Sequence, residues 1–205
     1  MAGVFRVGVL ASGAGTNLQA LLDKVHGRHG IEVVAVGANV AEAPALRRAR
    51  DANVEARAFP EPDRAQRDAA MGDWLSERGV DLVVLAGYMQ LVTPGFLARF
   101  PERVINVHPA LLPAFPGIRS VEQAVAYGVK VFGVTVHFVD EGVDSGPVIF
   151  QRAVELPEPH DAGTVRAALR PIEHELLTEA VRAIAAGAVR VDPDHPRRVY
   201  VSSDG

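Results

Sequence analysis

The sequence contains no cysteine among its 205 residues, and it has no long apolar run. The absence of cysteine excludes disulfide bonds and thiolate metal sites, while it leaves the redox compartment undetermined. No run approaches the roughly 18 apolar residues that a membrane-spanning helix needs. The N-terminal stretch MAGVFRVGVLASG also lacks the charged segment and long apolar core of a secretory signal. We therefore expect a soluble, cytoplasmic protein.

Charge of one sign is not concentrated in any block. The chain has 21 Lys and Arg against 25 Asp and Glu, which gives a formal net charge of -4 and a pI near 6.0. This balance disfavours a surface that coats nucleic acid, although it permits a local basic pocket. With 48% hydrophobic residues, a chain of this length can bury the core of a single domain.

Short apolar runs alternate with longer amphipathic runs through the first half of the chain. The strand-like runs are Phe5–Leu10, Ile31–Val36, Val54–Ala58, Leu82–Leu85 and Val104–Val107. The helix-like runs between them are Leu18–Lys24, Pro44–Ala52 and Arg64–Glu77. This alternation predicts βαβ units, and hence an α/β fold with a mostly parallel, Rossmann-like sheet flanked by helices.

The second half of the chain has a different pattern. Val131–Val139 and Val148–Val154 read as strands joined by the polar turn DEGVDSG, which predicts an antiparallel excursion. The helical region Thr164–Ala186 contains Pro171, where we expect a kink or a helix restart. Because there is no repeat, low-complexity segment or long linker, we expect one domain over residues 1–205, with the tail from about residue 188 at its periphery.

A glycine-rich turn, ASGAGTNLQALL, follows the first predicted strand. Leu18 stands where a dinucleotide fingerprint needs its third glycine, and no Gly-Lys-Ser/Thr of a Walker loop follows. Free amides and the positive end of the next helix favour an anion such as phosphate. An ordinary tight turn, with Thr16 or Asn17 near the helix N-cap, explains the same residues. The turn alone leaves both interpretations open.

The stretch NVHPALLPAFPG places Asn106 and His108 at the end of a predicted strand, where open α/β sheets bind ligands. Its prolines restrict the backbone, as suits a mount for functional groups. For an N-x-H pair alone, a structural histidine and a turn-capping asparagine are the commoner explanation. The second polar cluster, DEGVDSGPV, favours the functional reading because it also lies at a strand end and can supply a carboxylate.

These residue types suit the attack of an external nucleophile on a carbonyl group. A carboxylate beside an imidazole favours the protonated ring and orients it. An asparagine N–H can donate to a carbonyl oxygen as that oxygen gains negative charge. A covalent serine route fits poorly, because no G-x-S-x-G motif is present. Among the other histidines, we expect His26 and His29 to be solvated and His137 to support the site.

The motifs ASGAGTNLQALL, LAGYMQLV, NVHPALLP, GVTVHFVDEGVDSGPVI and IEHELL occur in this order. In this order and spacing they resemble the phosphoribosylglycinamide formyltransferases, folate-dependent enzymes of purine synthesis. The resemblance runs from about Val7 to Arg190. It implies transfer of a formyl group from 10-formyltetrahydrofolate to the primary amine of glycinamide ribonucleotide, without a metal or a covalent enzyme intermediate. It also implies no nucleic-acid or membrane partner, and it is compatible with a homodimer.

The resemblance assigns roles to particular residues. Asn106 and protonated His108 would bind the formyl oxygen of the tetrahedral intermediate, while Asp144 would keep His108 charged and assist proton transfer through water. The substrate-binding residues would be Gly15, Thr16, Asn17, Gly87, Pro109 and Glu173. The residues that contact the folate would be Arg64, Met89, Gln90, Leu91, Val92, Asn106, Asp140 and Glu141. For Met89, Leu91 and Val92, ordinary core packing is the alternative.

The sequence departs from the family pattern at a few positions. Arg119 stands where relatives often have histidine, and Gln90 stands where some have arginine. Arg119 cannot act as a titrating acid near neutral pH, so a proton-transfer role at that position would be lost. Arg170-Pro171 is also unusual just before Glu173.

Three alternatives remain from the sequence. One is a methionyl-tRNA formyltransferase, which is longer and has a basic C-terminal barrel. Another is a formyltetrahydrofolate deformylase, which has an additional N-terminal domain. The third is a non-catalytic nucleotide-binding module that needs no carboxylate beside His108.

Overall fold

The computed structural model of the chain describes residues 3–158 and 161–202. Residue contacts group into two compact units, residues 1–106 and residues 107–205. The boundary falls inside one strand, between Asn106 and Val107.

Five strands form the sheet of the first unit. They are β1 (Phe5–Ala11), β2 (Ile31–Ala38), β3 (Glu55–Ala58), β4 (Leu82–Leu85) and β5 (Val104–His108). All of their pairings are parallel: β1 with β2, β1 with β4, β2 with β3, and β4 with β5. The residues of β4 are all buried, as expected for a central strand covered on both faces.

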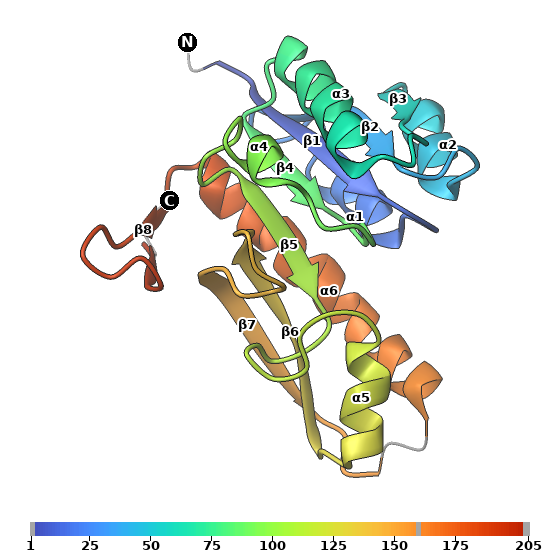
Figure 1. Ribbon diagram of the computed structural model, residues 1–205. Helices are drawn as coiled ribbons and strands as arrows, with labels where there is room; N and C mark the ends of the chain where they lie inside the picture. The colour runs from blue at the N-terminus through green and yellow to red at the C-terminus, as the bar shows by residue number, and fades with distance from the viewer. Residues whose placement is uncertain (1–2, 159–160, 203–205) are drawn as a thin grey trace. The chain divides into compact units, whose positions relative to one another are not determined.

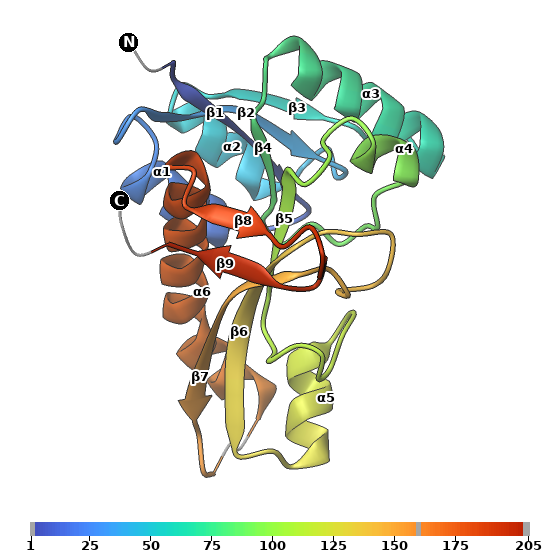
Figure 2. The same cartoon turned by 90° about the vertical axis from the view of Figure 1, so that its left-hand side faces the viewer.

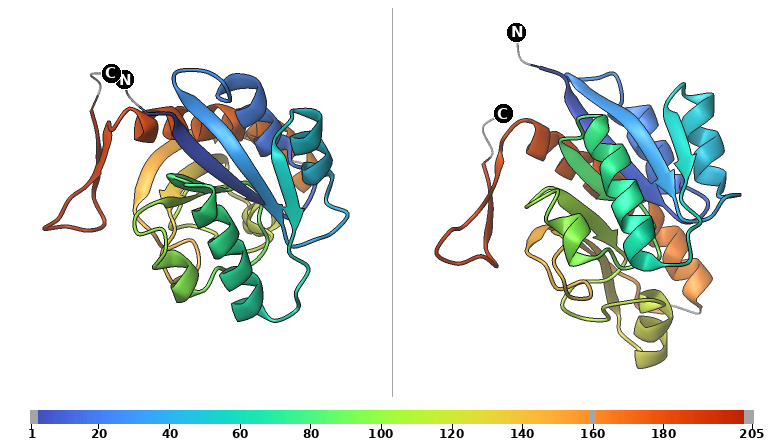
Figure 3. Two further views of the ribbon diagram at one scale, coloured as in Figure 1. Left: turned by 90° about the horizontal axis from the view of Figure 1, so that it is seen from above. Right: turned by 45° about the horizontal axis from the view of Figure 1, so that its top comes forward.

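Helices cover both faces of this sheet. They are α1 (Thr16–Lys24), α2 (Pro44–Asp51), α3 (Arg64–Glu77) and the single turn α4 (Pro94–Leu97). Figures 1 and 3 show α1 and α2 on one side of the strands, and α3 and α4 on the other. Local chemistry explains two of the helix starts. Asp63 accepts the amide hydrogen of Gln66 at the start of α3, and Thr93 accepts that of Phe96 at the start of α4.

The second unit is built on an antiparallel pair of strands, β6 (Val131–Phe138) and β7 (Val148–Glu155). The helix α5 (Ser120–Tyr127) precedes them, and the long helix α6 (Ala162–Ala185) follows them. Figure 2 shows α6 running alongside β6 and β7. A short hairpin, β8 (Val189–Val191) with β9 (Val199–Val201), ends the described chain.

The strand order of the seven-stranded sheet is β3-β2-β1-β4-β5-β6-β7. The predicted α/β class with a mostly parallel sheet is confirmed, because four strand pairings are parallel and the pairing of β6 with β7 is antiparallel. All seven of these strands were predicted from the sequence within a few residues. The treatment of the whole chain as one domain with a peripheral tail stays a prediction. In the described residues, no helix is long and apolar enough to cross a lipid bilayer.

Of the two outcomes expected at Pro171, a kink or a helix restart, the restart is wrong, because α6 continues through this residue. Proline removes one backbone donor, and its ring crowds the carbonyl of the preceding turn, so inside a helix it opposes continuation. Pro171 is exposed, whereas Leu169 and Leu176 on either side of it are buried. Apolar burial before and after Pro171 therefore holds the two halves of α6 in one helix.

Candidate active site

A histidine–aspartate centre, made of His108, His137 and Asp144, lies within the second unit. The Nδ1 atom of His108 lies 3.3 Å from Oδ2 of Asp144. The two side chains are 7% and 15% exposed, so solvent screens their interaction only weakly. The structure thus brings together the two residues on which the predicted chemistry most depends, although they are far apart in the sequence.

His137 completes this centre from β6. Its Nε2 atom lies 3.6 Å from Oδ1 of Asp144, and its Nδ1 atom lies 2.7 Å from the carbonyl oxygen of Phe138. A carbonyl oxygen can only accept, so Nδ1 of His137 carries the hydrogen of that contact. His137 is 1% exposed. Its predicted supporting position is therefore next to the carboxylate, where its ring fixes one oxygen of Asp144.

The surroundings of Asp144 stabilise its charged form. Burial acts to raise the pKa of this carboxyl group. The His137 side chain, the amide of Gly117 and the charge of His108 act in the opposite direction and win, so the pKa falls to about 2. The Gly117 amide donates to Oδ2 at 2.7 Å. Asp144 has a φ of 48°, a left-handed conformation that aspartate tolerates better than most residues.

His108 has acceptors at both of its ring nitrogens. Nε2 lies 2.9 Å from the carbonyl oxygen of Phe115, while Nδ1 faces Asp144. The doubly protonated ring satisfies both contacts, because it has two N–H donors. A substrate oxygen that is to receive the Nε2 hydrogen must therefore replace the Phe115 carbonyl. The sequence did not predict this backbone acceptor.

Buried polar contacts hold the proline-containing loop that follows β5. The hydroxyl of Thr135 on β6 donates to the carbonyl of Ala110 at 2.7 Å and accepts the amide of Leu112 at 3.1 Å. Gln151 on β7 donates to the carbonyl of Leu112 at 2.8 Å and to Thr135 at 3.0 Å. The loop is thus bonded to the two strands of its own unit, which supports the idea of a rigid mount for His108.

The glycine turn, residues 13–17, joins β1 to α1 in the first unit. Gly15 is the N-cap of α1, with a φ of 70° in the left-handed region. Neither Thr16 nor Asn17 occupies that position, since both belong to the first turn of the helix. Thr16 and Asn17 thus follow the N-cap directly, as expected, and Gly15 occupies the cap position because its missing Cβ allows both the backbone angle and close packing on Ala45.

The apolar segment Met89–Val92 follows β4. Met89 and Leu91 are 62% and 51% exposed, so they are not core residues, while Val92 is buried. The guanidinium of Arg64 donates to the carbonyl of Val92 at 2.6 Å, and the hydroxyl of Ser12 accepts the amide of Met89 at 2.8 Å. The predicted folate-contacting residues Arg64 and Met89–Val92 are thus neighbours, with apolar side chains presented on an anchored backbone.

The remaining predicted residues lie at the ends of strands, in turns or on α6. Asn106 precedes His108 by two positions in β5. Because side chains alternate between the faces of a strand, both project to the same side of the sheet. Gly87 follows β4 with a φ of 72°. Asp140 accepts bonds from Ser145 and Gly142, which order the turn that carries Asp144. The other members are Gln90, Pro109, Glu141 and Glu173, which are exposed or half-buried.

One further expectation is corrected by the structure. His26 is not simply solvated, because its Nδ1 accepts the amide of Val33 at 3.1 Å. Arg119 lies before α5 with its side chain 74% exposed and 3.9 Å from Glu122. In the parts of the chain that the structure describes, no group of three or more His, Cys, Asp or Glu side chains is arranged to hold a metal ion.

The sequence model of the formyl transferase family matches residues 5–181. The chain belongs to the formyl transferase family. This family assignment covers the glycine turn, the apolar segment and the histidine–aspartate centre. A phosphoribosylglycinamide formyltransferase of Mycobacterium tuberculosis is 43% identical over 189 residues, which are 91% of this chain and 87% of that relative.

Solved structures of formyl transferase family members have the same fold. The glycinamide ribonucleotide transformylase 1 of Symbiobacterium toebii is 45% identical with a TM-score of 0.92, covering 98% of this chain and 95% of that one. A formyltetrahydrofolate deformylase of Pseudomonas syringae is 28% identical with a TM-score of 0.88. The similarity covers 98% of this chain but 66% of the deformylase chain.

Proposed function

We propose that the chain transfers the formyl group of 10-formyltetrahydrofolate to the amine of glycinamide ribonucleotide, a step of purine biosynthesis. The products are formylglycinamide ribonucleotide and tetrahydrofolate. The observation that carries this proposal is the contact of His108 with Asp144, inside a chain that is similar to named phosphoribosylglycinamide formyltransferases over most of its length.

The reaction begins when the neutral amine attacks the formyl carbon. A C–N bond forms, and the formyl oxygen gains negative charge. The Nε2–H of His108 then donates to this oxygen in place of the Phe115 carbonyl, while Asp144 stabilises the positive ring. The Asn106 amide provides a second donor. Because the positive ring of His108 is in place before the amine attacks, it stabilises the intermediate without reorganisation at the moment of reaction.

Collapse of the intermediate breaks the bond between the formyl carbon and the folate nitrogen. The attacking nitrogen loses one proton, and the departing folate nitrogen gains one, so the reaction is balanced without a redox partner. Asp144 assists this proton transfer through water. Its pKa of about 2 keeps it ionised at neutral pH, so it acts as a charged partner and a hydrogen-bond acceptor.

The remaining assignments concern binding. In the first unit, Gly15, Thr16 and Asn17 receive the phosphate, and Met89–Val92 with Arg64 receive the folate. Glu173, Gly87 and Pro109 contact the ribonucleotide, while Asp140 and Glu141 border the folate. A cytoplasmic location, a homodimer and the absence of nucleic-acid and membrane partners also belong to this proposal.

Formyltetrahydrofolate hydrolysis is the second candidate, because the similarity to the Pseudomonas syringae deformylase covers 98% of this chain. An assay of tetrahydrofolate release, with and without glycinamide ribonucleotide, separates the two reactions. We expect release that depends on the amine. Equal release of formate without the amine would establish the hydrolase instead, and formylation of initiator methionyl-tRNA would establish a tRNA formyltransferase.

A further inference from the structure

The glycine turn has two of its carbonyl groups bonded to α2. The amide of Ala45 donates to the carbonyl of Gly13 at 3.2 Å. The Nε atom of Arg48 donates to the carbonyl of Ala14 at 2.8 Å. Consecutive peptide oxygens of the turn are therefore held toward the same helix.

Peptide geometry converts these contacts into an orientation of the amides. In a trans peptide the N–H points opposite to the C=O. With the oxygens of Gly13 and Ala14 held toward α2, the N–H groups of Ala14 and Gly15 point away from it. No acceptor among the described residues is paired with either amide. Successive amides that converge in this way form an anion-binding concavity.

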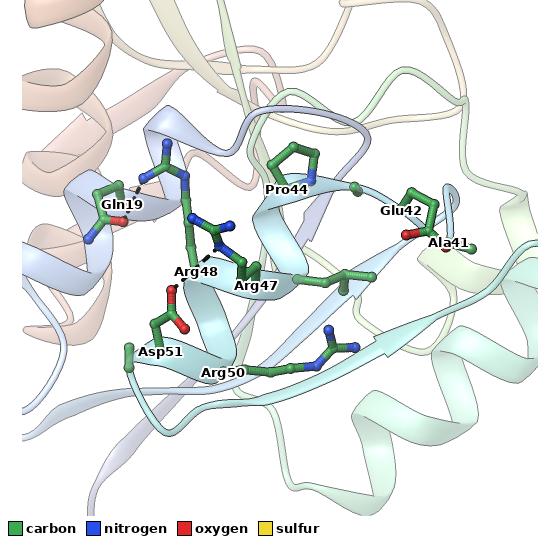
Figure 4. Close-up of a pocket in the computed structure, with 11 residues that line it drawn as sticks. Gln19, Ala41, Glu42, Pro44, Arg47, Arg48, Arg50 and Asp51 are labelled. Atoms are coloured by element: carbon green, nitrogen blue, oxygen red, sulfur yellow. Dashed lines mark hydrogen bonds and ion pairs between the residues drawn. The ribbon is translucent and has the colours of Figure 1, made fainter.

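Arg48 is the side chain that connects this turn to both flanking helices. Its Nη1 atom donates to the Oε1 atom of Gln19 on α1 at 2.9 Å, in addition to the Ala14 contact. Figure 4 shows Arg48 reaching toward Gln19, whereas Arg47 reaches Asp51 and Arg50 extends in another direction. Arg48 also lines a cavity of about 630 Å³ beside α2. One guanidinium thus fixes the turn and the first half of α1.

Close packing adds to this constraint. A Cβ atom on Gly15 would lie 2.8 Å from the Cβ of Ala45 and 3.4 Å from the Cδ of Arg48. Gly15 is therefore packed against α2, and α1 starts directly after it. The positive charge of Arg48 lies on the carbonyl side of the turn, where it adds to the positive potential of the helix end.

We infer that Arg48 is a positioning residue for phosphate recognition, acting through the peptide planes of the glycine turn. The inference rests on the proposed function, since it concerns the phosphate of that substrate. Arg48 need not touch the phosphate to act. Its bond to the Ala14 carbonyl sets the direction of the Gly15 amide, and its bond to Gln19 sets the position of α1 relative to the turn.

The substitution Arg48→Ala tests this role, with Arg47→Ala as its matched control. Both changes remove one arginine from α2, but the side chain of Arg47 is 87% exposed and lies 3.9 Å from Asp51 rather than on the turn. We expect Arg48→Ala to raise the KM for glycinamide ribonucleotide by roughly tenfold, the contribution of one charge-assisted hydrogen bond, with kcat retained. Arg47→Ala should leave KM within about twofold. Equal effects of the two variants would reduce the role of Arg48 to general electrostatics and overturn the inference.

A second measurement separates phosphate recognition from a general structural role. With the phosphate-free glycinamide riboside, Arg48→Ala and wild type should have the same KM. Arg48→Lys keeps the charge but not the forked donors, so it should recover only part of the lost affinity for the ribonucleotide. An equal loss with the phosphate-free substrate would contradict the inference.

Direct binding of inorganic phosphate makes the test independent of catalysis. Titration of the wild-type protein, followed by the amide signals of Ala14 and Gly15 in NMR spectra, should give a dissociation constant that Arg48→Ala raises by roughly tenfold. If wild type binds phosphate this way but transfers no formyl group, the proposed function fails while the role of Arg48 stands. If both variants bind phosphate equally, the role of Arg48 fails whatever the activity.

Discussion

Asp144→Asn is the substitution with the clearest expected consequence. The change keeps the size of the side chain but removes the charge between His108 and His137. It also places an amide group next to ring nitrogens that need acceptors. The Gly117 amide, which donates to Oδ2 at 2.7 Å, keeps an oxygen acceptor only if the new amide is oriented toward it.

The magnitude follows from the pKa of Asp144. A pKa of about 2 instead of 3.8 corresponds to about 2 kcal/mol in favour of the charged carboxylate. Burial opposes this direction, so the attractive interactions together exceed the net value. These attractive interactions include those with the His137 and His108 side chains, so they are lost when the carboxylate charge is removed. A loss of about 2 kcal/mol at the transition state lowers kcat by roughly 30-fold.

The same value defines a window of pH for stability. The pKa of Asp144 is lower in the folded chain than in the unfolded chain, so its contribution is complete above about pH 4. It is lost as the pH falls through the folded value of about 2. Wild type and Asp144→Asn should therefore differ in unfolding free energy at pH 6 by about 2 kcal/mol, and this difference should shrink toward pH 2.

The assay is steady-state formation of tetrahydrofolate, combined with urea unfolding. Glu155→Gln is a suitable control, because it removes one exposed carboxylate of β7 in the same unit. We expect Glu155→Gln to keep wild-type kcat and Asp144→Asn to lose at least about 30-fold. An Asp144→Asn enzyme that retains more than about a third of wild-type kcat would refute the role assigned to this charge.

Three further predictions concern the histidine–aspartate centre, the glycine turn and the residue before Met89. His137→Gln should lower kcat by about tenfold with little change in KM, because it weakens the contact that positions Asp144 but does not remove a substrate contact. A change in KM alone would contradict this. Gly15→Ala should lower the unfolding free energy, measured in urea, by more than Gly27→Ala does. Both glycines have a φ of 70°, but a Cβ at Gly27 meets no atom within 4 Å, so equal losses would rule out the packing argument. Burial raises the pKa of Tyr88 to about 12. The difference in ultraviolet absorbance between wild type and Tyr88→Phe should therefore show phenolate formation near pH 12. A titration midpoint near pH 10 would show that Tyr88 is solvated.

Much of the fold was predictable because hydrophobic periodicity encodes it. Leu82–Leu85 and Arg64–Glu77 were predicted with the bounds that the structure has. The sequence did not predict α4 and α5. A single turn such as α4 has too few residues to show a period, and α5 begins after Arg119 in a left-handed conformation that no local signal announces.

The candidate site was predictable to the extent that sequence motifs mark it. His108 and Asp144 were paired on the resemblance to a family, and the structure places them 3.3 Å apart. The Phe115 carbonyl on His108 and the Arg48 contact with Ala14 were not predictable, since backbone oxygens have no sequence signature. Contacts between residues 34 positions apart arise from the packing of α2 on the turn, which only coordinates reveal.

The proposed reaction forms a bond between a formyl carbon and a substrate amine. A reaction with ¹³C-formyl-labelled 10-formyltetrahydrofolate and glycinamide ribonucleotide labelled with ¹⁵N at its amine tests it directly by NMR. We predict a product whose ¹³C signal is split by one-bond coupling to ¹⁵N. Appearance of the ¹³C label in free formate, with the amine unchanged, would show hydrolysis in place of formyl transfer.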